Sequence, residues 1–446
     1  MTTPGTTTAT ATWRNWSGRV TANPAEIVRP ADTAEVAATV ARAAAAGLRV
    51  KPVGSGHSFT GIAVTDGVQV RLDRLTGLTD VDTETGLVTV RGGTPLHVLG
   101  PALAEHGLAM ENLGDIDRQT VTGATSTGTH GTGGAFGGIA TQIRGMELVL
   151  ADGSVVRCSS TENPRLLEFA RVGLGALGVV TELTLQCVPS FALHVVDEPM
   201  PLAEVLERLD DLVAENDHFE FFWFPYTETA LTRRFARLPA DTPLAPVNRF
   251  AHWFDDRVVT NIGFEALNRI STRRPAFVPT ANRIVSGSLS RREYTDLSHR
   301  VFASRRDVRF NEGEYAFGRE HTRDLLAEIR RWLATAEQRV SFPFEVRFVA
   351  ADDIPLAPTY RRTSGYIAFH QYHRMSHQPF FGAMEDVFAT VGGRPHWGKM
   401  HRLDAAGLRE RYPRFDEFTA LRGELDPTGV FANPYLDRVL GPVAGR

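Results

Sequence analysis

Two loops rich in glycine and hydroxyl residues constrain the fold of this chain most strongly. They are "GSGHSFTG" at residues 54–61 and "GDIDRQTVTGATSTGTHGTGG" at residues 114–134. Glycine lets backbone N–H groups approach a phosphate closely, and serine and threonine hydroxyls add further donors. Either loop alone is equally well explained by turn geometry, but two of them in one domain predict a clamp on a pyrophosphate group.

The two best-known phosphate-binding motifs do not fit these loops. Neither loop contains GxxxxGK[ST], and neither has GxGxxG at the start of a helix. A P-loop nucleotide hydrolase and a standard Rossmann dinucleotide site are therefore disfavoured.

The segments before the first loop are typical of an α+β domain. A helix is predicted over residues 31–48, with Asp32 or Thr33 as its N-cap. The strand "RVKPV" then runs straight into the first loop.

Two further elements continue this α+β pattern. A helix is predicted over residues 94–107, with Thr94 as its cap and Pro95 at its first position. A hairpin is predicted over residues 144–158, turning at the Asp-Gly pair 152–153.

The length of 446 residues exceeds what one hydrophobic core usually holds, so two domains are expected. From about residue 190 glycine becomes sparser, and aromatic and arginine-rich segments such as "HFEFFWFPY" appear. We predict a flexible tail over 1–12, a first domain over 13–188, a second domain over 189–393 and a C-terminal segment over 394–446 that returns to the first domain.

Charge and cysteine usage exclude several classes of protein. The net charge is −4 without a long basic block, which argues against nucleic acid as a partner. We see no apolar run long enough to span a bilayer, and therefore no membrane anchor. Cys158 and Cys187 do not form a CxxC pair, so we expect no structural metal, no disulfide scaffold and a reducing cytoplasm.

Polar residues alternate with aromatic ones in "FPFEVRFVA" (342–350). Strand geometry puts Glu345 and Arg347 on the face opposite Phe344, Val346 and Phe348. Such a carboxylate and guanidinium can form a structural ion pair or a substrate clamp.

Two more segments carry candidate polar groups. The alternation in "GYIAFHQYH" places His370 and Tyr372 on one strand face. The turn "RPHWGKMH" gathers His396 and Lys399 around Gly398. Its imidazole spacing does not suit a metal, whereas a lysine held against an anionic ring system would stabilise negative charge that appears during a reaction.

Five pieces occur in a fixed order along the chain: "GSGHSF", "GDIDRQTVTGATSTGTHGTG", "LGALGVVTELTL", "FEVRF" and "HWGKMH". Together they resemble the vanillyl-alcohol-oxidase superfamily of flavoproteins, in its aldonolactone oxidoreductase and alditol oxidase branch. Within that branch the chain is most similar to the actinobacterial L-gulono-1,4-lactone oxidases and dehydrogenases. The resemblance implies an α+β fold in which residues 13–188 are a two-part FAD-binding domain and residues 189–393 an α+β substrate (cap) domain with a mixed or antiparallel sheet.

The resemblance also implies the FAD contacts. His57 matches the histidine that bonds covalently to the 8α-methyl carbon of FAD in some members. His396 is expected beside the flavin, and Val179 or Val180 beside the adenine. The pyrophosphate and flavin contacts are expected from Val53, Gly54, Ser55, Gly56, Ser58, Phe59, Gly114, Asp115, Thr120, Gly123, Thr127, Gly128, Thr129 and His130.

The substrate side follows in the same way. Glu345 and Arg347 match the Glu-x-Arg of the family, Lys399 its lysine near the flavin pyrimidine ring, and His370 the candidate base of the alditol oxidases. Gln371 and Tyr372 are expected to line the same pocket. Asp115 is also expected to face substrate, and it stands where alditol oxidases have a serine, which leaves the exact polyol open.

The expected reaction is oxidation of a carbinol of a sugar lactone, with hydride transfer to flavin N5. Reoxidation is expected from O2, giving hydrogen peroxide, or from another acceptor. Gly114 favours the oxidase, since the family's dehydrogenases carry an alanine there. Alternatives are an alditol or nucleoside alcohol oxidase and, less consistent with the polar residues, a non-catalytic flavin sensor.

Overall fold

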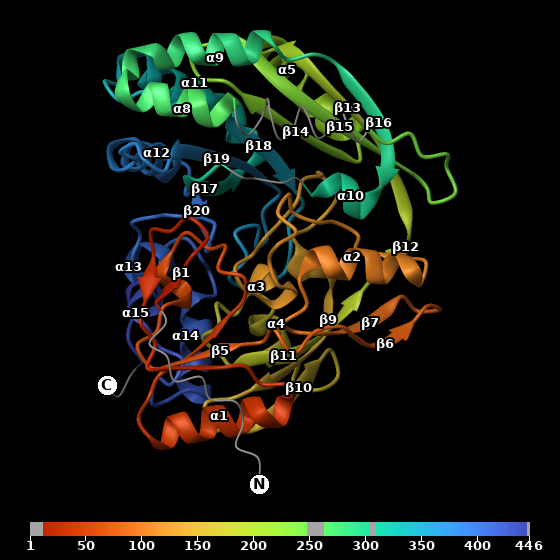
Figure 1. Ribbon diagram of the computed structural model, residues 1–446, viewed down its shortest axis with the longest axis vertical. Coiled ribbons are helices and arrows are strands. Elements are labelled where there is room, and N and C mark those ends of the chain that lie inside the picture. Colours follow the sequence, from red (N-terminus) through yellow and green to blue (C-terminus); the bar gives the residue numbers. More distant parts are fainter. Residues whose placement is uncertain (1–11, 248–262, 304–307, 444–446) are drawn as a thin grey trace.

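The computed structural model describes residues 12–247, 263–303 and 308–443. The chain forms two parts, one above the other in the view of Figure 1. One part contains the described residues near both chain ends, and the other contains the middle of the chain. Within the described ranges, no helix is both long and apolar enough to cross a membrane. The predicted tail over 1–12 lies outside the described residues except for Thr12, and the predicted domain boundaries stay predictions.

A small parallel sheet starts the first part and positions the first glycine loop. Helix α1 (Thr33–Ala45) begins after Asp32. The Asp32 side chain accepts a 2.8 Å hydrogen bond from the Glu35 N–H, so Asp32 rather than Thr33 is the N-cap. The apolar face of α1 packs on this sheet. Strand β4 ends at Val53, directly before the first glycine loop. In spatial order the strands are β3 (Glu26–Val28), β5 (Val68–Arg71) and β4 (Val50–Val53).

A five-stranded antiparallel sheet is the larger sheet of this part. Its predicted hairpin is confirmed, because β9 and β10 pair antiparallel around Gly153, which has a φ of +86°. Such a positive φ favours glycine. In spatial order the strands are β10 (Val155–Ser159), β9 (Ile143–Val149), β11 (Val179–Gln186), β7 (Leu87–Arg91) and β6 (Leu78–Asp82).

Helix α2 (Leu96–Glu105) starts one residue later than the sequence predicts. Pro95 is the cap residue rather than the first helical one. The Thr94 hydroxyl cannot cap the helix, since it donates to the carbonyl oxygen of Arg91 at 2.6 Å and accepts from the Gly77 N–H at 2.9 Å.

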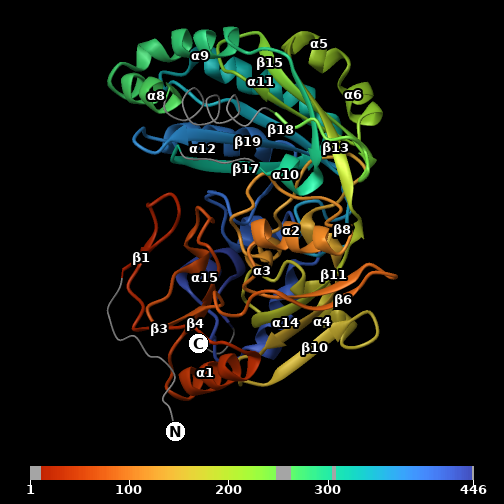
Figure 2. The ribbon, with the colours of Figure 1, turned by 45° about the vertical axis from the view of Figure 1, so that its right-hand side comes forward.

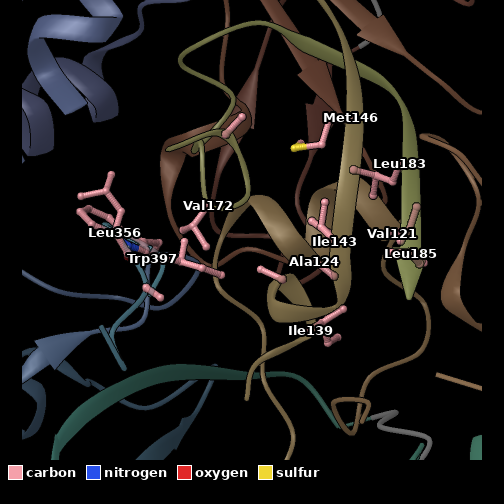
Figure 3. Packing of buried hydrophobic residues seen from close by; sticks show 14 of the residues in the cluster. Val121, Ala124, Ile139, Ile143, Met146, Val172, Leu183, Leu185, Leu356 and Trp397 are labelled. Carbon is pink, nitrogen blue, oxygen red and sulfur yellow. The ribbon is translucent and has the colours of Figure 1, made fainter. Parts of the chain in front are cut away.

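The C-terminal segment packs into the core of the first part. Phe418 and Leu436 join the same buried cluster as the strands of the five-stranded sheet. Trp397 lies at the edge of that cluster, where its indole N–H donates to the carbonyl oxygen of Leu356 at 2.7 Å (Figure 3). The helices and short strands of this part are α3 (Val121–Ser126), α4 (Pro164–Ala170), α13 (Ala405–Arg409), α14 (Phe415–Leu425), α15 (Pro434–Leu440), β1 (Trp13–Arg14), β2 (Thr21–Ala22), β8 (Leu108–Ala109) and β12 (Val188–Pro189).

The second part is built on an eight-stranded sheet whose neighbouring strands all pair antiparallel. In spatial order the strands are β16 (Arg292–Leu297), β13 (Phe191–Pro201), β15 (Thr229–Pro239), β14 (His218–Trp223), β18 (Phe344–Val349), β19 (Ser364–Tyr372), β17 (Phe310–Gly318) and β20 (Arg394–Pro395). After β20 the chain returns to the first part.

Alternation along the central strands gives this sheet two different faces. One face is aromatic and aliphatic: Phe344, Val346 and Phe348 pack there with side chains of α11 and α12. Figure 2 shows α5, α6, α9 and α11 on the side of the sheet away from the first part. The helices of this part are α5 (Leu202–Glu207), α6 (Leu209–Glu215), α8 (Phe264–Arg273), α9 (Val278–Gly287), α10 (Ser298–Phe302), α11 (Thr322–Thr335) and α12 (Gln378–Ala389).

The other face carries the charged residues. Glu345 and Arg347 lie on it, as the alternation predicts, and the pairing of Glu220 with Arg347 and of Glu312 with His370 brings four strands into one polar surface. Directly opposed residues of an antiparallel pair project to the same face. This surface, the polar face of the sheet, is the one directed at the glycine loops.

Candidate active site

A groove of about 230 Å³ runs between the two glycine loops. Helix α3 and its cap residue Thr120 form one wall, and the residues after β4 form the other. The predicted FAD contacts that line it are Val53, Gly54, Ser55, Gly56, His57, Ser58, Thr120, Gly123, Thr127 and Val180. Groove residues that the sequence analysis missed include Lys51, Arg71, Gln119, Ser126, Gly175 and Gly178.

Small residues keep this groove open, which makes it fit FAD. A Cβ on Gly54 would overlap the Thr120 hydroxyl, so only glycine lets the two walls approach this closely. Gly56 has a φ of +73°, and a Cβ there would lie 3.1 Å from the Trp13 ring. Closely placed backbone N–H groups and hydroxyls suit a pyrophosphate, which carries negative charge and accepts hydrogen bonds.

His57 lies in the wall of the groove as a neutral imidazole. Its ring stacks on Trp16, with centroids 5.9 Å apart and planes 22° apart. Burial, with help from the positive charge of Lys399, lowers the pKa of His57 to about 4. At neutral pH the ring therefore has a free lone pair, as a nucleophile requires.

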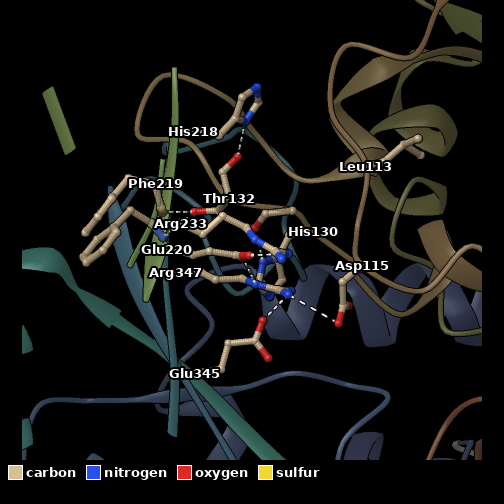
Figure 4. A network of polar contacts seen from close by, with 12 residues as sticks. Leu113, Asp115, His130, Thr132, His218, Phe219, Glu220, Arg233, Glu345 and Arg347 are labelled. Atoms are coloured by element: carbon tan, nitrogen blue, oxygen red, sulfur yellow. Dashed lines mark hydrogen bonds and ion pairs between the residues drawn. The ribbon is translucent and has the colours of Figure 1, made fainter. Parts of the chain in front are cut away.

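The second glycine loop is fastened to the polar face. The Gly133 N–H donates to the carbonyl oxygen of Phe348 at 2.7 Å, and the Thr132 hydroxyl donates to the carbonyl oxygen of Phe219. His218 Nδ1 is 2.6 Å from the carbonyl oxygen of Thr132 (Figure 4). Strands β14 and β18 thus set where residues 114–134 meet the sheet.

Arg347 is the centre of a buried ion-pair network on this face (Figure 4). Its guanidinium contacts Glu345, lies 3.0 Å from Glu220 and 3.5 Å from Asp115. Burial alone would lower the pKa of Arg347, but the three carboxylates raise it well above its usual value. Behind it Arg233 lies 3.7 Å from Glu220. Asp115 therefore joins the second glycine loop to the polar face of the sheet.

Lys399 and His370 meet at a second carboxylate, Glu312 of β17. Lys399 Nζ lies 2.5 Å and His370 Nε2 3.3 Å from the same oxygen, Glu312 Oε1. The ammonium also lies over the ring of Phe59, 5.4 Å from its centroid. The turn 396–401 and the first glycine loop thus reach the polar face together.

His130 and His396 form a third buried group with Glu314. His130 Nε2 is 3.3 Å from Glu314 and its ring stacks on Tyr366 at 3.7 Å between centroids. His396 Nδ1 accepts the Gly398 N–H at 3.0 Å, so its proton is on Nε2. That nitrogen cannot then ligate a metal, and we read these groups as a hydrogen-bonded cluster.

The other predicted residues divide between the site and the core. Gln371 points to the face opposite His370, where its amide donates to the carbonyl oxygens of Arg339 and Ser376, so it does not reach the polar face. Tyr372 packs with Phe59, and its hydroxyl donates to Glu265 at 2.5 Å.

Eight predicted FAD contacts lie outside the groove lining: Phe59, Gly114, Asp115, Gly128, Thr129, His130, Val179 and His396. Val179 is buried in the core beside α1, which leaves Val180 as the groove residue of that pair. Gly128 and Thr129 follow α3, with Gly128 at a φ of +75° and Thr129 accepting from Gln119 at 3.3 Å.

Three buried carboxylates of this site were missed: Glu220, Glu312 and Glu314. The signal was present in the sequence, because each interrupts an aromatic strand, in "HFEFFW" and "FNEGEYAF". Buried acids need a cationic or hydrogen-bonding partner, and such partners gather at functional sites.

Together these features define a class of protein. A family model described as an FAD-binding domain matches residues 24–159, a range that contains both glycine loops. The chain is an FAD-dependent oxidoreductase that acts on CH–OH groups. More particularly, it belongs to the D-arabinono-1,4-lactone oxidase family, whose model matches residues 183–439.

Several characterised relatives match almost the whole chain. It is similar to L-gulono-1,4-lactone dehydrogenase of Mycobacterium tuberculosis, at 46% identity over 96% of this chain and 99% of the relative. L-gulonolactone oxidase of Bos taurus is 36% identical, and alditol oxidase of a Streptomyces strain 34%, each over 96% of this chain and 98% of the relative. The predicted branch of the flavoprotein superfamily is confirmed.

Solved structures agree on the fold. Cholesterol oxidase from Brevibacterium sterolicum superposes with a TM-score of 0.79, at 17% identity, covering 97% of this chain and 96% of the other. The predicted α+β fold, with an FAD-binding domain and antiparallel sheet, is confirmed.

Proposed function

We propose that this protein oxidises a carbinol of an aldono-1,4-lactone of the L-gulono-1,4-lactone type. The observation that supports this most is the polar face of the sheet, where a guanidinium, an ammonium and five carboxylates face the FAD groove in a buried setting. A small, hydroxyl-rich and uncharged substrate needs several fixed donors and acceptors of this kind. The lactone enzymes of similar sequence support the same substrate class.

The substrate contacts are proposed on the polar face. Arg347 and Glu345 hold hydroxyl groups of the lactone as donor and acceptor, and Asp115 extends the contact from the loop. Holding the carbinol in one orientation supplies much of the rate increase. Tyr372 borders the same region through its packing against Phe59.

Proton transfer is proposed at His370, with Lys399 beside it. His370 Nε2 accepts the hydroxyl proton, and the Lys399 ammonium offsets the negative charge that develops nearby. FAD, when bound, accepts the hydride at N5 and passes the electrons to O2 or another acceptor. His130 and His396 border the flavin side of the site.

Covalent attachment of FAD through His57 is part of the proposal. An imidazole nitrogen of His57 would hold the 8α carbon of FAD; one hydrogen would leave the imidazole and one the methyl group, and the resulting two protons and two electrons would reduce O2 to hydrogen peroxide. The neutral, stacked ring of His57 in the groove wall supports this role.

Gly114 supports reoxidation by O2. A Cβ at this position would lie 3.1 Å from both the His130 carbonyl oxygen and the Thr129 methyl group, so a larger residue would narrow the approach. Both cysteines of the chain are buried and free, which supports a reducing compartment such as the cytoplasm.

The second candidate is an alditol oxidase, favoured by the 34% identical alditol oxidase. A substrate panel separates the candidates: L-gulono-1,4-lactone, D-arabinono-1,4-lactone, xylitol, sorbitol and a nucleoside, each with product identification by mass spectrometry. Turnover of a lactone with the highest kcat/KM is expected. A higher kcat/KM for xylitol or sorbitol would contradict the lactone as substrate and support a polyol. Turnover of none of these compounds would support the non-catalytic flavin sensor.

A further inference from the structure

A single carboxylate oxygen links Lys399 to His370. Glu312 lies on β17 directly opposite His370 on β19, so the two side chains share the polar face. Glu312 Oε1 lies 2.5 Å from Lys399 Nζ and 3.3 Å from His370 Nε2. The backbone of Glu312 also binds the turn that carries Lys399, because its carbonyl oxygen accepts a 2.9 Å hydrogen bond from the Met400 N–H.

His370 has further contacts besides the one with Glu312. Its Nδ1 lies 3.4 Å from the carbonyl oxygen of Pro343, and its ring meets Phe310 edge-on at 4.9 Å between centroids. Both ring nitrogens therefore face acceptor oxygens, and the ring satisfies both contacts when each nitrogen carries a proton. A proton gained at Nε2 then points at Glu312, which stabilises the resulting positive charge.

We propose that Glu312 is a positioning residue of this active site: it holds Lys399 as an ammonium and stabilises the His370 ring after that ring has taken the proton of the substrate hydroxyl. In this step the substrate O–H bond breaks and an N–H bond forms at His370 Nε2. The inference rests on the proposed function, and it adds a residue that acts through two others.

The composition of the chain supports a special role for this lysine. Lys51 and Lys399 are the two lysines in the sequence, and every other basic side chain among its 48 lysines and arginines is arginine. Arginine stays charged at any working pH, whereas a buried lysine changes its pKa readily with its surroundings. The charge of Lys399 is therefore set by its neighbours, of which Glu312 is nearest.

The surroundings act on Lys399 from several elements. Burial alone would lower the pKa of Lys399, but Glu312, then Glu314 and Asp115, raise it. The pKa of Glu312 would rise on burial, yet the charges of Lys399 and His370 lower it. The titratable groups that lie near Lys399 on the neighbouring elements are Glu312, Glu314, Asp115, His57, His370 and His396.

The test compares Glu312→Gln with Glu312→Asp in the FAD-loaded protein. Glutamine keeps the size and the acceptor but removes the charge, whereas aspartate keeps the charge. An amine-reactive acylating reagent applied across a pH series, with peptide mass spectrometry, gives the midpoint at which Lys399 becomes reactive. Lys51 is only 2% exposed, and the N-terminal amine serves as the internal reference.

Loss of an opposite charge within about 6 Å shifts a pKa by about 1–3 units. In Glu312→Gln we therefore expect the Lys399 midpoint to fall by about one unit or more, and the basic limb of the kcat profile to move to lower pH by a similar amount. Glu312→Asp is expected to restore both. Glu198→Gln removes a carboxylate that pairs with Arg234 on the same sheet, and it is expected to leave the midpoint unchanged.

The outcomes separate this inference from the proposed function. An unchanged Lys399 midpoint in Glu312→Gln overturns the inference, even if the rate falls. A lowered midpoint together with a basic limb that stays in place also overturns it. A lowered midpoint in a protein that oxidises no lactone supports the link between Glu312 and Lys399 and overturns the proposed substrate alone.

Discussion

The backbone N–H of Phe59 donates to the carbonyl oxygen of Gly398 at 2.7 Å. This bond joins the first glycine loop to a turn that lies about 340 residues further along the chain, and it brings His57 and Lys399 to the same region. A Cβ on Gly398 would lie 3.3 Å from both the Ser58 hydroxyl and the His396 ring. The FAD groove and the polar face therefore meet because the chain returns at this turn.

Replacing His57 tests the covalent tether. In His57→Ala we expect FAD to bind without attachment, so that acid precipitation leaves a colourless pellet and a yellow supernatant. In the parent protein the colour is expected in the pellet. His106→Ala, an exposed histidine after α2, is the control and should keep the colour in the pellet. A colourless parent pellet would contradict the attachment.

The pKa of His57 predicts how attachment depends on pH. Because burial and the charge of Lys399 lower this pKa to about 4, the imidazole is neutral at all higher pH values. We expect apoprotein to incorporate FAD covalently at a constant rate between about pH 5 and pH 8, and more slowly near pH 4. A rate that rises steeply between pH 6 and about pH 7 would show that the ring titrates at its ordinary value.

Removing the charge of Glu345 should slow the reaction with substrate. Glu345→Gln keeps the shape but weakens both the contact with Arg347 and the hold on substrate hydroxyls. Loss of orientation of this kind costs on the order of 10²-fold in rate. Stopped-flow reduction under nitrogen measures it, with Glu198→Gln as the control. If Glu345→Gln reduces as fast as the parent, its substrate role is wrong.

Gly114→Ala should separate the two half-reactions. The added methyl group would press on the His130 carbonyl oxygen and Thr129, each 3.1 Å away, and narrow the approach of O2. We expect peroxide formation to fall by about tenfold or more while turnover with an artificial dye acceptor is kept, since a 1.4 kcal/mol higher barrier is about tenfold in rate. Equal loss with O2 and dye would point instead to damage to FAD binding.

Lys51 gives a prediction about stability. Burial, and then the charge of Arg422, lowers the pKa of Lys51 to about 7, below its unfolded value of 10.5. Between these values the unfolded chain binds one more proton than the folded chain, so this group makes the free energy of unfolding rise with pH. Below about pH 7 Lys51 is charged in both states, and the full cost of burying its charge lowers the free energy of unfolding.

Lys51→Met removes that pH-dependent term. It also leaves the carbonyl oxygens of Gly175 and Phe431 without their 3.0 Å donor, a loss of stability that does not depend on pH. Urea unfolding at pH 7 and about pH 9 should show the stability gap between parent and variant widening as the pH rises. A gap that stays constant or narrows contradicts the lowered pKa.

Local periodicity predicted the parts of this molecule that short-range rules decide. The helix capped by Asp32, the Asp-Gly hairpin and the two faces of "FPFEVRFVA" all follow from caps, turns and the two-residue repeat of a strand. The position of the first loop in the groove wall was also predictable, because its glycine and hydroxyl residues indicate a backbone suited to binding phosphate.

The rest depended on pairing between distant strands. Glu312 becomes a partner of Lys399 only because β17 pairs with β19 and the turn after β20 lies across them. Gln371 was expected in the pocket beside Tyr372, but strand alternation turns it to the opposite face. Register between strands far apart in sequence is not encoded in any short segment.

We propose that a sugar lactone reacts on the polar face of the sheet, beside a bound FAD. The most direct test is to mix the FAD-loaded protein with L-gulono-1,4-lactone under nitrogen and follow the flavin absorbance. We expect the yellow colour to bleach in one turnover and to return on admission of air. An oxidised spectrum that persists with this lactone and with D-arabinono-1,4-lactone would contradict it.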